Sequence, residues 1–230
     1  MNNSIIGIIA AMHKEADGIV QKMSVTNTET ISGITFTLGK LNGKDCVVAV
    51  CGIGKVFASL CAQTMILRYS PSLIINSGVA GGLAPSLKVC DIALASSLVQ
   101  HDMDTSALGY PKGMISGINI INLPCDEKNT ERLRRCAEAE GIKTFTGVIA
   151  SGDRFVSSTS DKKAIIDDFS AIACEMEGAA IAHVCYVNNV PCCVMRAISD
   201  GGDDDAVLDY PTFAKMAAQR AINVILRFFE

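Results

Sequence analysis

Glu15 follows a continuously apolar run, at the point where a helical pattern begins. The N-terminal end of a helix favours an ionised carboxylate, because the helix dipole is positive there. An ionised carboxylate can accept a proton from water, so Glu15 is a candidate general base. The alternative is that Glu15 reflects only the common acidic bias of a first helical turn.

Glu175, Met176 and Glu177 end an apolar, strand-like run. Two carboxylates are costly at such a place unless they are solvated or bound to a partner. If the strand extends through Glu177, both carboxylates share one face and Met176 points to the other. Carboxylates accept hydrogen bonds from the vicinal hydroxyls of a ribose, and methionine packs against a ring. In the alternative, Glu177 lies in a first helical turn and interacts only with the helix dipole.

Asp200 follows the apolar run Cys192–Ile198 and precedes two glycines. In a pocket with little water its pKa rises, and the carboxyl can donate a proton to a leaving-group nitrogen. Alternatively, Asp200 caps a helix or closes a turn. The nearby run 203–205 consists of three adjacent aspartates without the alternating spacing of a calcium loop, so we expect a solvated loop and no metal site.

A glycine-rich stretch, 77–82, directly follows the buried run Leu73–Asn76. Glycines let the backbone approach a ligand closely and present its amide N–H groups. The stretch has neither the spacing of a dinucleotide-binding loop nor the Lys-Ser/Thr of a P-loop. The alternative is a tight turn between two strands.

Short β-rich runs alternate with helical patterns, which predicts an α/β fold. A single domain over residues 1–230 is the expectation, because the chain shows no linker or repeat. The polar stretches 100–117, 151–161 and 200–209 follow strands, so we expect them to surround one ligand site at the carboxyl ends of those strands. The expected strands are 5–10, 35–41, 45–51, 73–76, 91–95, 144–150, 172–175 and 192–198, and the expected helices are 13–23, 55–69, 126–140, a segment ending at 187, and 212–229.

Composition favours a small-molecule partner. The formal net charge is −4 and no basic run is long enough to hold a nucleic-acid backbone. The apolar start, Ile5–Met12, is too short for an export signal or a membrane span. The ten cysteines form no CxxC pair and mostly lie in apolar runs, which is typical of reduced, buried thiols. We therefore expect a cytoplasmic protein without nucleic-acid or membrane partners.

Taken in chain order, these stretches resemble the bacterial 5′-methylthioadenosine/S-adenosylhomocysteine nucleosidases, which have the fold of the purine nucleoside and uridine phosphorylases. The resemblance implies a three-layer α/β/α domain with a central twisted mixed sheet. It also implies an adenine-nucleoside substrate, no cofactor and a homodimer. The stretches that carry it are 7–12 with Glu15, 52–56, 74–83, 151–153, 175–177, 180–185 and 196–200.

The resemblance also implies a role for each matching residue. Glu15 would activate the attacking water, and Asp200, helped by Ser199, would protonate N7 of adenine. Glu177 would bind the ribose hydroxyls while Met176 packs against the nucleoside. The reaction would pass through an oxocarbenium-like sugar and needs no covalent nucleophile.

Recognition of the base and of the 5′ group follows from the same resemblance. Phe155 would stack on the base, and the main chain of Val156 would bond its N1 and N6 edge. Leu108 occupies the place of an aromatic residue that a dimer partner often lends to the 5′ pocket. Val79 and Thr105 also differ from the family pattern, so 5′-deoxyadenosine joins the candidate substrates. The other expected substrate-binding residues are Ile53, Ala80, Gly81, Glu175 and Arg196.

Hydrolysis is favoured over phosphorolysis by the residues themselves. A phosphorylase holds phosphate with arginines beside backbone N–H groups. No arginine precedes Arg68, none lies in the glycine-rich stretch, and Glu15 would repel an anion. Arg196 alone makes a poor phosphate clamp. A phosphate-dependent purine nucleoside phosphorylase remains the alternative enzyme, and a non-catalytic nucleoside-binding module is a second alternative, although binding alone needs no Glu15.

Overall fold

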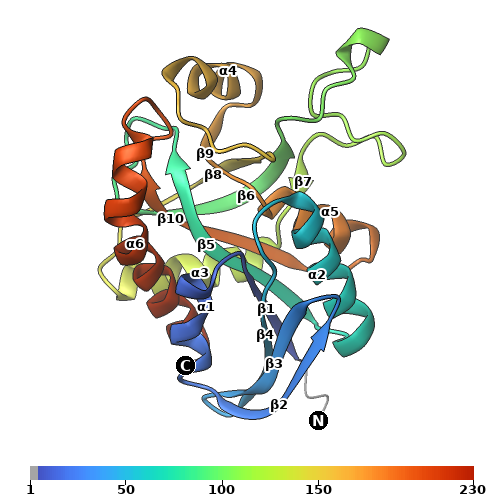
Figure 1. Ribbon diagram of the computed structural model, residues 1–230, viewed down its shortest axis with the longest axis vertical. Coiled ribbons are helices and arrows are strands. Elements are labelled where there is room, and N and C mark those ends of the chain that lie inside the picture. The colour runs from blue at the N-terminus through green and yellow to red at the C-terminus, as the bar shows by residue number, and fades with distance from the viewer. Residues whose placement is uncertain (1–4) are drawn as a thin grey trace.

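The computed structural model describes residues 5–230, whose strands form one mixed sheet with helices on both faces (Figure 1). Neighbouring strands follow the order β10-β6-β8-β9-β5-β1-β4-β3-β2, and β7 pairs with β6. The strands are β1 (Ile6–Ala10), β2 (Ser24–Ile31), β3 (Ile34–Leu41), β4 (Lys44–Val50), β5 (Leu73–Gly82), β6 (Ile92–Gln100), β7 (Leu123–Pro124), β8 (Thr144–Ser151), β9 (Ala171–Glu175) and β10 (Cys192–Asp200).

One half of the sheet closes on itself. β5 pairs in parallel with β10 along most of its length, and its last residues pair antiparallel with β9. The strands β5, β10, β6, β8 and β9 therefore form a ring, whereas β1, β4, β3 and β2 extend from β5 as an open sheet. The twist of the strands coils the sheet enough for this closure. As a result, the ends of β5, β9 and β10 lie close together.

The helices cover both faces of the sheet and give the expected three-layer α/β/α arrangement. The helices α1, α3 and α6 lie on one face, and α2 and α5 lie on the other (Figure 1). Within residues 5–230, none of the helices is long and apolar enough to cross a membrane. Their bounds are α1 (His13–Val20), α2 (Lys55–Tyr69), α3 (Glu127–Ala139), α4 (Thr159–Phe169), α5 (Gly178–Val187) and α6 (Ala206–Phe228).

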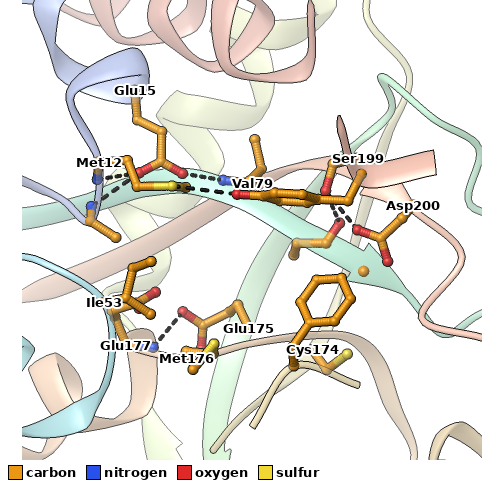
Figure 2. A pocket seen from close by; sticks show the side chains of 15 residues that line it. Met12, Glu15, Ile53, Val79, Cys174, Glu175, Met176, Glu177, Ser199 and Asp200 are labelled. Carbon is orange, nitrogen blue, oxygen red and sulfur yellow. Dashed lines mark hydrogen bonds between the residues drawn. The ribbon is translucent and has the colours of Figure 1, made fainter. Parts of the chain in front are cut away.

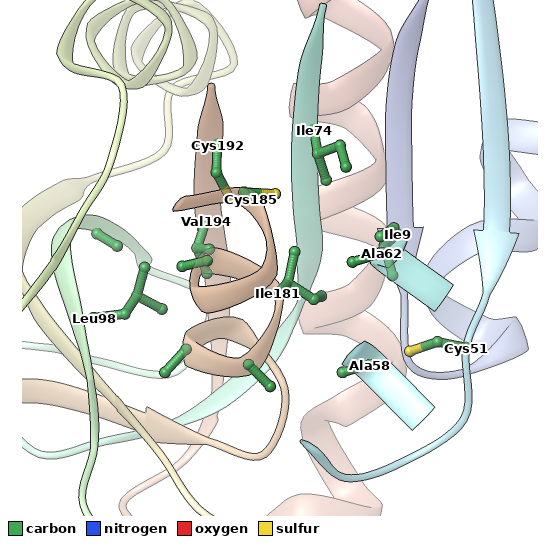
Figure 3. Packing of buried hydrophobic residues seen from close by; sticks show 14 of the residues in the cluster. Ile9, Cys51, Ala58, Ala62, Ile74, Leu98, Ile181, Cys185, Cys192 and Val194 are labelled. Atoms are coloured by element: carbon green, nitrogen blue, oxygen red, sulfur yellow. The ribbon is translucent and has the colours of Figure 1, made fainter. Parts of the chain in front are cut away.

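Two large hydrophobic clusters fill the spaces between these layers. Ile8 belongs to the cluster under α1 and α6, and its neighbour Ile9 belongs to the cluster under α2 and α5. This split arises because successive side chains of a strand point to opposite faces. Figure 3 shows the second cluster, in which Ile181 of α5 and Ala58 of α2 pack toward the strands.

The strand β5 corrects one interpretation of the glycine-rich stretch. The stretch is not a tight turn: β5 continues through it to Gly82, and all ten of its residues are buried. Gly78 is needed because a Cβ there would lie 2.7 Å from Nη1 of Arg196 and 2.8 Å from Oε1 of Glu15. The glycine therefore lets two charged side chains approach the strand.

Several elements and boundaries differ from the expectations, and three of them have a clear physical reason. The strand β2 is polar and mostly exposed, so it carries no apolar pattern, and it is held by antiparallel pairing with β3. The helix α4 occupies part of a stretch expected to be a loop; only Ile165 among its residues is buried, and Ser158 caps its N-terminus. The helix α6 begins at Ala206, ahead of the expected start at 212, and it contains Pro211, which lacks the N–H for a helical hydrogen bond.

Candidate active site

A cavity of about 250 Å³ lies where the ends of β1, β5, β9 and β10 converge (Figure 2). Three of its acidic residues, Glu15, Glu177 and Asp200, come from segments far apart in the chain. The closed half of the sheet brings Glu177 and Asp200 together, and the pairing of β1 with β5 adds Glu15. The cavity is lined by Ala11, Met12, Glu15, Ile53, Val79, Ala80, Gly81, Phe155, Cys174, Glu175, Met176, Glu177, Ser199, Asp200 and Tyr210.

Backbone amides hold the carboxylate of Glu15. Its Oε2 accepts hydrogen bonds from the N–H groups of Ala11, at 3.0 Å, and Met12, at 2.9 Å. Its Oε1 accepts a third from Val79 in β5, at 3.0 Å (Figure 2). Burial raises the pKa of Glu15, whereas the positive charge of Arg196 and these three donors oppose the rise. The result is a buried carboxylate in a fixed orientation, which suits a base that must accept a proton from one bound water.

Glu175, which lines the cavity, forms a buried ion pair with Arg196, which lies behind it. The Nε of Arg196 donates to Glu175 Oε2 at 3.1 Å, and Nη2 donates to the same oxygen and to Asn76. The same oxygen of Glu175 also accepts from the backbone N–H of Gly178 at 2.7 Å, and Ser151 donates to its other oxygen. The hydrogen-bonding groups of Glu175 and Arg196 therefore already have partners within the protein. This favours a role for the pair in positioning neighbouring residues.

Glu177 lies at the N-terminus of α5, since β9 ends at Glu175. Strand alternation therefore does not extend to Glu177, and Glu175, Met176 and Glu177 all line the cavity. Glu177 Oε1 accepts from the N–H of Gly54 at 2.8 Å, and Oε2 lies 3.8 Å from Arg196 Nη2. Burial, with the nearby charge of Glu175, raises the pKa of Glu177 to about 7.

Asp200 and Ser199 lie at the opposite end of the cavity (Figure 2). Ser199 Oγ donates to Asp200 Oδ2 at 2.8 Å, and the N–H of Gly202 donates to Oδ1 at 2.9 Å. Burial raises the pKa of Asp200, and the nearby charges of Asp209 and Asp203 add to the rise. Asp200 therefore closes a short turn through Gly202, which was the alternative to a catalytic role. It also lines the cavity, as a proton donor must.

Most of the other expected binding residues reach the cavity, and three do not. Ile53, Val79, Ala80, Gly81, Phe155 and Met176 line it. Arg196 lies behind it, and the side chain of Val156 packs into a separate hydrophobic cluster with Leu83 and Ile165. Leu108 is 77% exposed, in a short 3-10 helix (Ser106–Leu108) of the long segment between β6 and β7 that projects from the molecule (Figure 1).

Four further residues line the cavity without having been expected there: Ala11, Met12, Cys174 and Tyr210. The first three lie within or next to stretches that the sequence singled out. Tyr210 had no such signal, because it lies between the expected polar stretch 200–209 and the expected helix 212–229. In the structure the Tyr210 ring packs edge-on against Phe155, with ring centroids 5.6 Å apart. This contact places Tyr210 beside the residue expected to stack on the base.

Within residues 5–230, no three His, Cys, Asp or Glu side chains are arranged to hold a metal ion. The aspartates of the acidic loop instead bind protein groups. Asp203 pairs with Lys162 at 3.2 Å, and Asp204 accepts a hydrogen bond from the Thr159 hydroxyl. Asp102, which follows a histidine, pairs with Lys55 at 2.6 Å.

The fold and the cavity agree with a known family. The model of the Phosphorylase superfamily matches residues 5–230. The chain belongs to this superfamily. Among its relatives, a 5′-methylthioadenosine/S-adenosylhomocysteine nucleosidase of Shewanella loihica is 36% identical over 227 residues, covering 98% of both chains.

Solved structures of superfamily members confirm the nucleoside phosphorylase-like fold. A Neisseria meningitidis 5′-methylthioadenosine/S-adenosylhomocysteine nucleosidase, in complex with methylthio-immucillin-A, has a TM-score of 0.94 at 32% identity and covers 98% of both chains. A Helicobacter pylori futalosine hydrolase has a TM-score of 0.94 at 36% identity, covering 98% of this chain and 97% of its own. These comparisons confirm the resemblance to the nucleosidases.

Proposed function

We propose that this superfamily member hydrolyses the N-glycosidic bond of 5′-methylthioadenosine, S-adenosylhomocysteine or both, releasing adenine and the 5′-modified ribose. The observation that carries the proposal is the carboxylate of Glu15, which three backbone amides hold in the same cavity as Glu177 and Asp200. The nucleosidase relatives of the same length support it. 5′-Deoxyadenosine and futalosine-type nucleosides are further candidates, the latter because of the futalosine hydrolase relative.

In this mechanism the bond between the sugar C1′ and the adenine N9 breaks as Asp200 donates a proton to N7. Ser199 orients Asp200 through its 2.8 Å hydrogen bond. The sugar becomes an oxocarbenium-like species, and Glu177 holds its hydroxyls. Glu15 then takes a proton from the water that attacks C1′. Phe155 stacks on the base, Met176 packs against the nucleoside, and no cofactor takes part.

Water is favoured over phosphate by the way Glu15 is held. The backbone N–H groups of Ala11, Met12 and Val79 converge as they would on a bound oxyanion. The carboxylate of Glu15 already accepts all three of these hydrogen bonds, and its charge repels a second anion. The alternative of a phosphate-dependent purine nucleoside phosphorylase would need these donors for phosphate.

We further propose that the chain acts as one domain in a cytoplasmic homodimer. Exposed apolar residues on α2 and α5, among them Val56, Leu67 and Val187, support a buried subunit face. Leu108 is exposed on a segment that projects from the molecule, which supports its being offered to a partner's 5′ pocket. The ten cysteines are free thiols, eight of them buried, which suits a reducing compartment.

Adenine release, measured by chromatography, tests the proposal. The protein is incubated in phosphate-free buffer with 5′-methylthioadenosine, S-adenosylhomocysteine and 5′-deoxyadenosine, and with futalosine, from which hypoxanthine is followed in place of adenine. The reactions are repeated with added phosphate and with inosine. We expect adenine and free 5′-modified ribose at rates that phosphate does not change. Release only with phosphate, or only from inosine, would contradict the proposal, and tight binding without product would indicate a binding module.

A further inference from the structure

Asp153 caps the N-terminus of α2 from a distant segment of the chain. The residue before the helix is Gly54, which has no side chain that could serve as a cap. Asp153 follows β8, and its Oδ1 accepts a hydrogen bond from the backbone N–H of Lys55, 98 residues away in sequence, at 2.7 Å. The first N–H groups of a helix lack partners within the helix, and a carboxylate also interacts favourably with the helix dipole. Asp153 therefore supplies the cap that Gly54 cannot.

A second carboxylate holds both ends of this contact. The N–H of Asp153 donates to Asp102 Oδ2 at 2.9 Å, and Lys55 Nζ donates to Asp102 Oδ1 at 2.6 Å. The three residues thus form a closed ring of hydrogen bonds, which joins the segments after β6 and β8 to the first residue of α2. The side chains of Lys55 and Asp102 are 19% and 30% exposed, so the ring is partly shielded from water.

The amide next to this ring contacts Glu177. The N–H of Gly54, directly before Lys55, donates to Glu177 Oε1 at 2.8 Å. Two neighbouring amides therefore bind two carboxylates, of which Glu177 lines the cavity and Asp153 does not. Gly52 and Gly54 have φ angles of +95° and +98°, a region that favours glycine. Because glycines are conformationally permissive, this turn depends on contacts such as the one with Asp153 to keep its shape.

We propose that Asp153 is a positioning residue that orients Glu177 toward the hydroxyls of the ribose. This inference rests on the proposed function, in which Glu177 holds those hydroxyls. Gly54 engages one oxygen of Glu177 and thereby fixes the direction of the other. Ile53, in the same turn, lies on the same side of the cavity as Glu177 (Figure 2). Loss of the acceptor at Asp153 would free the start of α2 and let the N–H of Gly54 move away from Glu177.

The test compares 5′-methylthioadenosine with its 2′-deoxy and 3′-deoxy analogues. Each analogue lacks one hydroxyl, so the ratio of the two kcat/KM values for adenine release measures how well that hydroxyl is held. Asp153→Ala should lower the preference for the ribonucleoside over at least one analogue about fivefold, the effect of weakening one hydrogen bond. Asp153→Asn should keep most of the preference, because its amide oxygen can still accept from Lys55. A general loss of stability would lower all three rates together and leave the ratios unchanged.

Asp126→Ala is the matched control. Asp126 accepts from the N–H of Asn129 at 2.8 Å and caps α3, and it does not line the cavity. Its loss removes a comparable cap and should leave both ratios unchanged. Amide hydrogen exchange followed by mass spectrometry gives a second readout that needs no turnover. Exchange in the segment 52–56 should be faster in Asp153→Ala than in the wild type, and unchanged in the control.

The inference is overturned if Asp153→Ala keeps both wild-type ratios or the wild-type exchange in this segment. It is also overturned if Asp153→Asn loses as much preference as Asp153→Ala, or if the control lowers the ratios equally. Absence of adenine release from 5′-methylthioadenosine by the wild type would instead overturn the proposed function, and hydrogen exchange would still test whether Asp153 fixes the turn.

Discussion

Glu177 should lower the stability of the folded protein at alkaline pH. The residue is 5% exposed, the charge of Glu175 is nearby, and the pKa of Glu177 is raised from 4.5 to about 7. Between these two values the folded state binds more protons at this group than the unfolded state does. The free energy of unfolding therefore falls as the pH rises through this window and stays low above it. Below pH 4.5 the carboxyl is protonated in both states and contributes no difference.

The magnitude follows from the same two pKa values. One pKa unit corresponds to about 1.4 kcal/mol, so the charged carboxylate costs about 3 kcal/mol at pH 8.5. Glu177→Gln removes this charge and keeps an oxygen that can accept from the N–H of Gly54. The variant should therefore be more stable than the wild type by about 2 to 3 kcal/mol at pH 8.5. At pH 4.5 the two proteins should differ by less than about 1 kcal/mol.

Urea unfolding followed by circular dichroism measures this difference. The chain has no tryptophan, so fluorescence offers only tyrosine signals. Both proteins are unfolded at pH 4.5 and pH 8.5, at one protein concentration so that any self-association contributes equally. Glu127→Gln, at an exposed position of α3, is the control and should show no such pH-dependent gain.

The outcome that refutes the reasoning is equal stability of Glu177→Gln and wild type at pH 8.5, or a gain that is the same at both pH values. Equal stability would show that Arg196 and the N–H of Gly54 fully compensate the buried charge, and an equal gain at both pH values would show that the gain does not come from the titration of Glu177. Loss of adenine release in a more stable variant is the expected companion result. It would show that the carboxylate is kept for substrate binding at a cost in stability.

Three further predictions follow from the same geometry. Asp200→Asn should lower kcat for adenine release at least about 10³-fold while circular dichroism stays unchanged, because the amide cannot donate an acidic proton; a fully active variant would rule out the proton-donor role. The pH profile of kcat/KM should be bell-shaped, with its alkaline limb set by Asp200. Ser199→Ala should move that limb to higher pH, because the Ser199 hydroxyl lowers the pKa of Asp200. A move to lower pH would contradict this. Phe36→Ala should cost about 3 to 5 kcal/mol in urea unfolding, since the ring is fully buried against Tyr69, whereas Thr35→Ala on the exposed face should cost under about 1 kcal/mol; equal losses would contradict the assigned strand faces.

Local pattern was sufficient for the elements with a strong apolar signal. The helix Lys55–Tyr69 was predicted with its observed bounds, because its apolar residues recur at helical spacing and Pro71 follows. The strand β2 and the helix α4 carried almost no such signal, since one is largely exposed and the other buries only Ile165. Their structure depends on pairing with β3 and on packing against β8 and β9.

The candidate site shows the same division. Glu15, Glu177 and Asp200 could be chosen from the sequence because each acidic side chain ends an apolar run. Their distances from one another could not be predicted from the sequence, because β9, β5 and β10 meet only through the closure of the sheet. The engagement of Glu175 by Arg196 was equally invisible, since it depends on side chains 21 residues apart that become neighbours in the interior.

Sequence alone therefore determined the α/β class, the order of the main elements and the acidic residues available for chemistry. Tertiary structure decided which of those residues share a cavity, which carboxyl group backbone amides hold in place, and that Tyr210 joins them. The physical reason is that apolar periodicity depends on neighbours along the chain. The environment of a buried charge, and hence its pKa, depends on groups that only the folded chain brings within a few ångströms.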